Sequence, residues 1–346
     1  MAGKRAFNFQ FVGGVALVWG TLILTLGSRL PSVSRMLAYN AEQDDVNGAP
    51  TPAKWQDTPI HWQINPSVGS NVQTAGGVSV TTALRNAFNT WQSSRLSNQS
   101  LTSISFTQDA NTGQTDPDSS DCTDTVSFVP SSAITWPTGA VAFTDVATDS
   151  GPPPTTYGCT TTPTARTCNL GACIVDADMA FNPGLEFSTT TTTPQGAFDV
   201  QSTATHEIGH LLGLDHSGIA HAMMYAFGDT GALGQQRTLS IDDAAGVAFL
   251  YQGANFPSAT GTISGQVTLS GSGIFAAHVL AIDVTSGNAV IDGFTDTSGN
   301  YSLIGVPPGH YSVLALPLAG VYDLSDFGGW YCGFSENSPP CCDPSQ

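Results

Sequence analysis

The chain has 346 residues, of which 40% are hydrophobic and only 10% are charged. That length accommodates two domains with cores of their own, and that hydrophobic content excludes a wholly disordered chain. Beyond position 35, only five Lys and Arg remain against 27 Asp and Glu. Nucleic acids and anionic membrane surfaces are therefore not expected as partners, because an acidic protein repels phosphate groups.

The N-terminus has the pattern of an export signal. Lys4 and Arg5 precede an apolar stretch over residues 11–26, and a charged segment before a short apolar one directs secretion. We expect residues 1–27 to be a signal peptide and the protein to be secreted and extracellular. The alternative is an uncleaved signal anchor in a membrane, since this stretch falls just short of the roughly twenty residues that span a bilayer. Residues 28–52 are polar and are expected to form a linker or a short pro-segment.

The next part of the chain alternates between strand and helix patterns. Alternating apolar residues predict strands over residues 55–64, 103–106, 125–129 and 139–146, and helical spacing predicts a helix over residues 82–91. The threonine-rich run over residues 189–194 is expected to be a solvent-exposed spacer. A further helix is expected from residue 198 to residue 212, with Asp199 as its N-cap. Its apolar face contains Val200, Ala204, Ile208 and Leu211.

Seven cysteines divide into two groups along the chain. Cys122, Cys159, Cys168 and Cys173 lie in the central region, and the spacing does not form the paired knuckles of a metal site. In an exported protein these four are expected to make two disulfides, whose connectivity stays open at this point. The other three lie in the C-terminal tail and leave one odd thiol: Cys332, Cys341 and Cys342.

The most specific motif lies on the helix expected over residues 198–212. His206 and His210 are spaced i and i+4, so both imidazoles lie on one helix face and can hold one metal ion. Gly213 allows a left-handed turn that ends the helix and returns His216 as a third ligand. Three protein nitrogens with one open position are typical of catalytic zinc. We therefore predict a single Zn²⁺ held by these histidines, with Glu207 as the general base that takes a proton from water polarised by the ion.

This motif and its surroundings resemble the metzincin zinc metallopeptidases, and the matrixin branch in particular. Ser217 follows the third histidine, and Met224 is similar to the family's Met-turn, the hydrophobic floor beneath the metal. Residues 239–251 resemble the closing helix, and residues 176–182 resemble the edge strand and turn before the active-site helix. The resemblance covers residues 53–253. It implies an α+β catalytic domain, with a mixed twisted sheet, an active-site helix and a C-terminal helix, and the activity of a zinc-dependent endopeptidase.

The resemblance also has departures. Tyr225 is expected to pack against the substrate pocket or to help bind substrate, but Ala226 stands where matrixins usually have Pro, so the wall of the specificity pocket is undefined. Many matrixins bind a second, structural zinc through histidines, and no histidine occurs between His61 and His206. A second zinc is therefore not expected. The first cysteine is Cys122, so a pro-segment cysteine that blocks the zinc is not expected either.

Residues 260–318 change to glycine-rich alternating strands. Strands are predicted over residues 261–269, 277–284, 296–303 and 306–313, separated by turns rich in Ser, Pro and Gly. The pattern resembles the carboxypeptidase regulatory-like domain, which implies a small all-β, prealbumin-like sandwich with a stabilising or docking role. His278 and His310 are expected to be ordinary residues of that sandwich. Residues 319–346 form a Cys-containing tail.

Calcium is a further candidate ion. Asp accounts for 23 of the 27 acids, and loop carboxylates are the ligands that Ca²⁺ prefers. A structural Ca²⁺ with candidates Asp145, Asp176 and Asp178 is one expectation, and the alternative is that these are solvated loop acids.

The predicted function is that of a secreted zinc metalloendopeptidase, a monomer whose partner is a protein or peptide substrate. The alternative from another class is a non-catalytic surface-adhesion or polymer-binding protein that uses the metzincin fold as a scaffold. The intact Glu207 argues against it. A third alternative is an enzyme that processes one dedicated partner.

Overall fold

The structure is a computed structural model that describes residues 41, 43–46, 49–96, 102–136 and 139–317, all within one compact unit of the chain. The predicted signal region and the tail with its three cysteines lie outside these described residues. In the described part, no helix is long and apolar enough to cross a membrane.

The strands up to the zinc-motif helix are β1 (Gln43–Val46), β2 (Ala49–Pro52), β3 (Ile60–Ile64), β4 (Val72–Gln73), β5 (Phe106–Gln108), β6 (Thr125–Ser127), β7 (Ala142–Ser150), β8 (Thr155–Gly158), β9 (Ala165–Cys168), β10 (Ala172–Phe181), β11 (Phe187–Ser188) and β12 (Phe198–Asp199). The helices are α1 (Val80–Gln92), α2 (Val200–Leu211), the short 3-10 helix η1 (Gly231–Gly234), α3 (Ile241–Leu250) and α4 (Phe256–Ala259). The C-terminal strands are β13 (Gly261–Gln266), β14 (Thr268–Leu269), β15 (Ser272–Gly273), β16 (His278–Asp283), β17 (Ala289–Phe294), β18 (Asn300–Val306) and β19 (Tyr311–Leu316).

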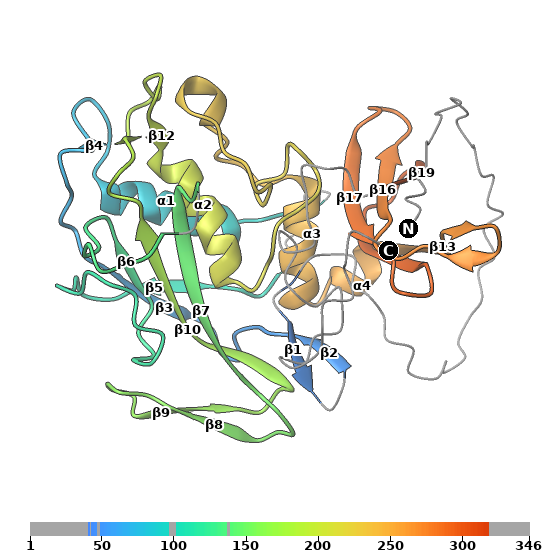
Figure 1. The fold of residues 1–346 in the computed structure, drawn as a ribbon, viewed down its shortest axis with the longest axis horizontal. Helices are drawn as coiled ribbons and strands as arrows, with labels where there is room; N and C mark the ends of the chain where they lie inside the picture. Colours follow the sequence, from blue (N-terminus) through green and yellow to red (C-terminus); the bar gives the residue numbers. More distant parts are fainter. Residues whose placement is uncertain (1–40, 42, 47–48, 97–101, 137–138, 318–346) are drawn as a thin grey trace, which may run out of the picture. The chain divides into compact units, whose positions relative to one another are not determined.

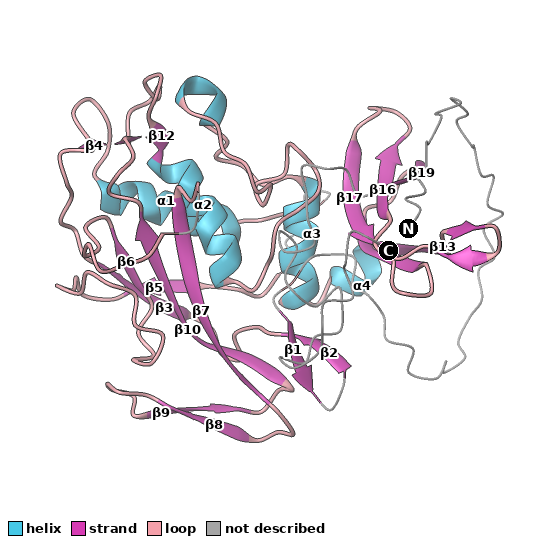
Figure 2. Cartoon of the chain, viewed as in Figure 1, coloured by secondary structure: helices cyan, strands magenta, loops and turns pink. Residues whose placement is uncertain are grey.

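A five-stranded mixed sheet forms the frame of the first part, in the order β5-β3-β6-β10-β7. β3 runs parallel to β5 and β6, β10 runs parallel to β6, and β7 is antiparallel to β10. Alternate residues of β3 are buried, as predicted, and Trp62 stacks on Phe88 of α1 with ring centroids 4.2 Å apart. α1 and α2 pack against each other (Figures 1 and 2), and both contribute to the same core as β3. The predicted mixed sheet with helices is confirmed.

The prediction that residues 176–182 form an edge strand is wrong. β10 lies between β6 and β7, and every one of its ten residues is buried. The two aspartates of this buried strand are accommodated because backbone N–H groups donate to them: Cys122 to Asp176 at 2.9 Å and Thr125 to Asp178 at 2.7 Å. β7 forms the edge of the described sheet instead.

Two other expectations need correction. The strand expected over residues 103–106 begins only at its last residue and continues as β5 to Gln108. The threonine run is not a fully exposed spacer, because Thr189 and Thr193 are buried. Thr189 Oγ1 donates to Val78 O at 2.6 Å, and Thr193 Oγ1 donates to Asp199 Oδ2 at 2.9 Å. The first hydroxyl binds the segment just before α1 and the second binds the N-cap of α2, so both buried hydroxyls are hydrogen-bonded.

The start and the apolar face of α2 follow the prediction. Asp199 is the N-cap and accepts from Ser202 N at 2.8 Å. The Asp199 carboxylate also pairs with Arg237, whose Nε donates to Oδ1 at 2.9 Å. The four predicted apolar residues of this helix are at most 1% exposed: Val200, Ala204, Ile208 and Leu211.

The C-terminal part consists of small antiparallel β-sheets, in the orders β13-β18, β14-β15 and β17-β16-β19. This confirms an all-β arrangement, although β17 was not among the predicted strands. The sheets share a core with α3, because Ala244, Ala245 and Ala248 cluster with Val279 and Ile291. The other side of α3 belongs to the main core through Val247 and Leu250.

The two predicted disulfides are present in the described chain. Cys122 is bonded to Cys159, and Cys168 is bonded to Cys173. They lie at opposite ends of the β8–β9 hairpin, because Cys159 directly follows β8 at the turn and Cys168 is the last residue of β9. Disulfides of this kind are typical of proteins that fold in an oxidising compartment.

Candidate metal centre

The C-terminus of α2 turns sharply at a glycine. Gly213 has a φ of +87°, its N–H donates to His210 O at 2.8 Å, and Leu214 N donates to Gly209 O at 2.9 Å. These two bonds form a Schellman motif, which ends a helix in a left-handed residue. A Cβ at Gly213 would lie 2.5 Å from Ala53 O. The position therefore requires glycine, and the turn sends the chain back toward His216 as the sequence predicts.

Three imidazoles converge beside this turn. His206, His210 and His216 each offer a ring nitrogen, and these nitrogens all lie within 4.8 Å of one another. The Nε2 atoms of His206 and His210 are 3.2 Å apart. Nitrogen ligands of a tetrahedral zinc with Zn–N of about 2.05 Å lie about 3.3 Å apart. The described residues contain no other cluster of three or more such side chains.

Backbone carbonyls fix the orientation of two of these rings. His206 Nδ1 lies 2.7 Å from Met223 O, and His210 Nδ1 lies 2.9 Å from Leu214 O. Because a carbonyl can only accept, each Nδ1 carries the proton and each Nε2 presents its lone pair to the centre. This is the tautomer that a metal ligand needs, so the residues fit a zinc ion.

The protonation of the rings also suits a cation. Burial, and then the neighbouring His216, lower the pKa of His206 to about 4. Burial, and then His206 and His216, hold the pKa of His210 well below its ordinary value. Both rings are therefore neutral at neutral pH, as metal binding requires.

Glu207 lies beside the triad on α2 and is 5% exposed. Its Oε2 accepts from Thr144 Oγ1 of β7 at 2.8 Å. Burial raises the pKa of Glu207 to about 7, although the Thr144 hydrogen bond opposes the shift. A carboxyl with a pKa near the working pH is suited to general acid and base chemistry. Thr144 lies 63 residues before Glu207, and nothing in the sequence marked it as a partner.

The segment around Met224 forms a buried floor under the histidines. Met224 is 2% exposed, and a Cβ added at Gly209 of α2 would lie 2.1 Å from its Sδ. Ser217 N donates to Met224 O at 2.8 Å, which joins this segment to the residue after His216. The structure thus brings the predicted Met-turn residue against the active-site helix.

Helix α3 holds this floor in place. The Asp243 carboxylate accepts from Met223 N at 2.7 Å and from Met224 N at 3.0 Å. It also completes a capping box with Ser240 at the start of α3. Asp243 was not singled out from the sequence, although the Ser-x-x-Asp spacing is a readable N-cap signal. Tyr225, at the end of the floor segment, is half-buried, and its ring contacts Phe227 with centroids 5.8 Å apart.

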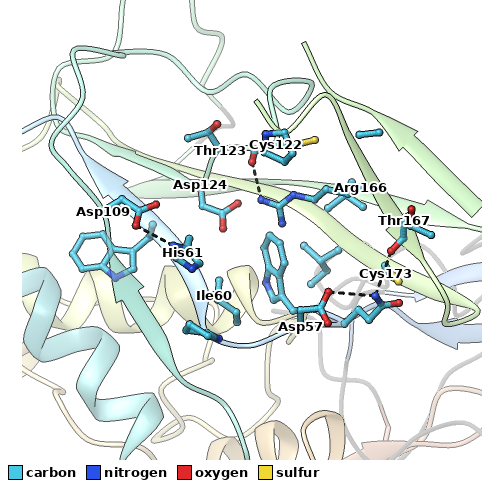
Figure 3. Close-up of a pocket in the computed structure, with 18 of the residues that line it drawn as sticks. Asp57, Ile60, His61, Asp109, Cys122, Thr123, Asp124, Arg166, Thr167 and Cys173 are labelled. Carbon is cyan, nitrogen blue, oxygen red and sulfur yellow. Dashed lines mark hydrogen bonds and ion pairs between the residues drawn. The ribbon is translucent and has the colours of Figure 1, made fainter. Parts of the chain in front are cut away.

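A separate cavity of about 610 Å³ is lined by residues of β3, β9 and β10 and by the segments before β3 and β6. His61 and Gln63 line it, and they alternate along β3 with the residues that face the core. Arg166 also lines this cavity, and its Nη2 donates to Cys122 O at 2.7 Å (Figure 3). His61 Nδ1 pairs with Asp109 Oδ1 at 2.9 Å on its rim. None of the three converging histidines lines the cavity, so it is distinct from the metal centre.

Comparisons with known proteins agree with this geometry. Residues 153–252 match the Matrixin family model, which covers the histidine triad, the floor and α3. Metalloendoproteinase 2-MMP of Arabidopsis thaliana is 47% identical over 68 residues, which are 20% of this chain and 17% of that protein. Metalloendoproteinase 1-MMP of the same organism is 49% identical over 55 residues, which are 16% of this chain and 15% of that protein. The matches thus span less than a fifth of these relatives' length. Residues 153–252 are thus similar to the matrixins, and they contain the three converging histidines.

Proposed function

We propose that the protein is a zinc-dependent endopeptidase that hydrolyses peptide bonds in a protein or peptide substrate. The observation that supports this most directly is the convergence of three imidazoles, two of them with lowered pKa values, beside one buried carboxyl of raised pKa. Both the family match and the similar metalloendoproteinases agree with this chemistry.

The three histidines would hold the zinc, and Glu207 would move the proton. Zinc bound there supplies a Lewis acid that polarises the peptide carbonyl and makes water a better nucleophile. Glu207 takes a proton from the attacking water and later gives it to the departing amine. Thr144 orients the carboxylate, because its hydroxyl donates to Oε2 and leaves the other oxygen for water. No covalent link between enzyme and substrate is needed.

The surroundings of the centre have supporting roles in this proposal. Met224 forms the floor of the Met-turn, and Tyr225 packs the substrate pocket. Residues 53–253 form the catalytic domain, and residues 260–318 form a carboxypeptidase regulatory-like sandwich of the prealbumin type. The two disulfides support secretion of the protein to an extracellular location.

A structural Ca²⁺ is a further part of the proposal. Asp176 and Asp178 are buried acids on β10, not loop acids, and Asp145 lies opposite Asp178 on β7. Asp176 Oδ1 and Asp124 Oδ2 are buried without a hydrogen-bond partner. Buried carboxylate oxygens of this kind are stabilised by a proton or by a cation, so the pair Asp124 and Asp176 is where we expect Ca²⁺ to act.

The experiment that tests the function combines metal analysis with cleavage of a peptide library by the purified protein. We expect one zinc per chain and cleavage at internal peptide bonds. His210→Ala removes one nitrogen of the triad, so zinc content and cleavage should both be lost. His221→Ala is the matched control, because His221 is exposed and lies close in sequence but outside the triad.

Other outcomes discriminate the alternatives. A protein that holds zinc yet cleaves no peptide in the library would favour the adhesion or polymer-binding alternative. A protein that takes up no zinc, even when zinc is supplied to folded material, would refute the proposal.

A further inference from the structure

The loop that follows the third histidine is held by the C-terminal β strands. Gly218 lies two residues after His216, and its N–H donates to Asp292 Oδ2 of β17 at 2.8 Å. His278 Nε2 of β16 lies 2.7 Å from the same oxygen. Because a carboxylate oxygen only accepts, both groups donate to Asp292. A single carboxylate therefore joins the loop to two neighbouring strands.

A second connection runs through α3. Asp292 N donates to Asp242 Oδ1 at 3.2 Å, and Asp242 also hydrogen bonds to the Ser217 side chain. Ser217 in turn donates its N–H to Met224 O at 2.8 Å. The two residues after His216 are thus held by the β strands, by α3 and by the Met224 floor.

The contact is close and shielded from water. A Cβ added at Gly218 would lie 2.4 Å from Asp292 Oδ2 and 2.5 Å from His278 Nε2, so only glycine admits this approach. Asp292 is 4% exposed and His278 is 9% exposed. Truncating one member of such a buried polar set leaves its partners unsatisfied and is costly.

The strands are also packed onto the catalytic part by apolar contacts. The small side chains of Ala244, Ala245 and Ala248 on α3 allow Val279 and Ile291 to approach the helix. These contacts fix where Asp292 lies relative to the loop. The strands are therefore built into the frame of the metal centre.

We propose that Asp292 is a positioning residue: it fixes the loop that carries His216 and so strengthens zinc binding at the triad. This inference rests on the proposed zinc function. It gives the C-terminal β strands a role at the metal centre and assigns to His278 the task of orienting the Asp292 carboxylate. Groups that orient metal ligands from the second layer typically change metal affinity by about 10–100-fold.

The test is zinc affinity of the full chain, measured by competition with a chromophoric chelator, together with the absorption spectrum of the Co²⁺-substituted protein. Asp292→Ala should weaken zinc binding by about 10–100-fold and change the Co²⁺ ligand-field bands. Asp292→Asn keeps an oxygen that accepts from Gly218 N, so its zinc affinity should be close to that of the wild type and well above that of Asp292→Ala. Gly218→Ala disturbs the same contact from the catalytic side and should weaken zinc binding as Asp292→Ala does.

Asp296→Ala is the matched control. Asp296 belongs to the same β part and accepts from Ser298 N and Asn300 N, both at 2.8 Å. Its loss should lower the thermal stability of the strands and leave zinc affinity and the Co²⁺ spectrum unchanged. If Asp292→Ala fails to fold, Gly218→Ala decides the question.

The outcomes separate this inference from the proposed function. If the wild-type protein binds zinc and both Asp292→Ala and Gly218→Ala bind it equally tightly, the positioning role is overturned. If Asp296→Ala weakened zinc binding equally, the positioning role would also be overturned, because general destabilisation of the β strands would then explain the loss of affinity. If the wild-type protein binds no zinc, it is the proposed function that fails.

Discussion

Replacing the glycine that ends α2 by alanine adds a single methyl group and tests the geometry of the metal centre. Gly213 has a φ of +87°, and a Cβ there would lie 2.5 Å from Ala53 O. The left-handed conformation costs a non-glycine residue about 1–2 kcal/mol, and overpacking costs about 1–3 kcal/mol. Alanine also lowers the conformational entropy of the unfolded chain, which offsets about 0.4–1 kcal/mol of these two costs. We therefore expect Gly213→Ala to lower the free energy of unfolding by about 2–4 kcal/mol.

The same substitution should weaken zinc binding. Leu214, the next residue, orients His210 through its carbonyl, and the turn delivers His216 to the centre. The assay is urea unfolding of the metal-free protein, followed by zinc competition on the folded fraction. Gly228→Ala is the control, because Gly228 is exposed, lies outside the left-handed region and has no atom within 4 Å of an added Cβ. If Gly213→Ala proved as stable as Gly228→Ala and bound zinc equally well, the geometric reasoning would be refuted.

Further predictions concern the disulfides, a buried acid and calcium. Replacing Cys122 and Cys159 by Ser should lower the free energy of unfolding by about 4 kcal/mol, and replacing Cys168 and Cys173 by Ser should lower it by about 2 kcal/mol. The first loss is larger because the first disulfide closes a longer loop, with a sequence separation of 37 against 5. Equal losses in urea unfolding would contradict this prediction. Burial, and then Asp176, raise the pKa of Asp178 to about 8, so the folded state binds this proton more tightly than the unfolded state. That stabilisation is complete at low pH and is lost as the pH rises toward about 8, so the unfolding temperature should fall between about pH 6 and pH 9; a pH profile that rises over this range would exclude it. Millimolar Ca²⁺ should raise the unfolding temperature of the zinc-loaded protein, and an unchanged temperature would remove calcium from the proposal.

The parts of the site that depend on local spacing could be predicted from the sequence. The i and i+4 spacing puts His206 and His210 on one face, and Gly213 makes the turn that returns His216 to them. The N-cap at Asp199 was likewise predictable, because it depends only on residues of its own turn. Local periodicity and turn chemistry act over a few residues, which is why these features were readable.

The parts that depend on tertiary contacts could not be predicted in the same way. Thr144 reaches Glu207 only because β7 forms the sheet edge beside α2. The edge position expected for residues 176–182 came from the family resemblance, whereas the burial of Asp176 and Asp178 depends on N–H groups of Cys122 and Thr125, before and at the start of β6. His278 was expected to be an ordinary sandwich residue, yet its partner Asp292 lies on a strand that was not predicted.

The most direct test of the central claim is the cleavage rate of an unfolded protein by Glu207→Gln carrying one zinc per chain. Gln keeps the shape of the side chain and can still accept from Thr144, but it cannot take a proton. We predict an unchanged zinc content and a rate about 10²–10⁴-fold below that of the wild type. Glu186→Gln is the control and should leave the rate unchanged, because Glu186 is exposed and lies just before β11, outside the triad. A zinc-loaded Glu207→Gln protein that cleaves as fast as the wild type would contradict the proposed mechanism.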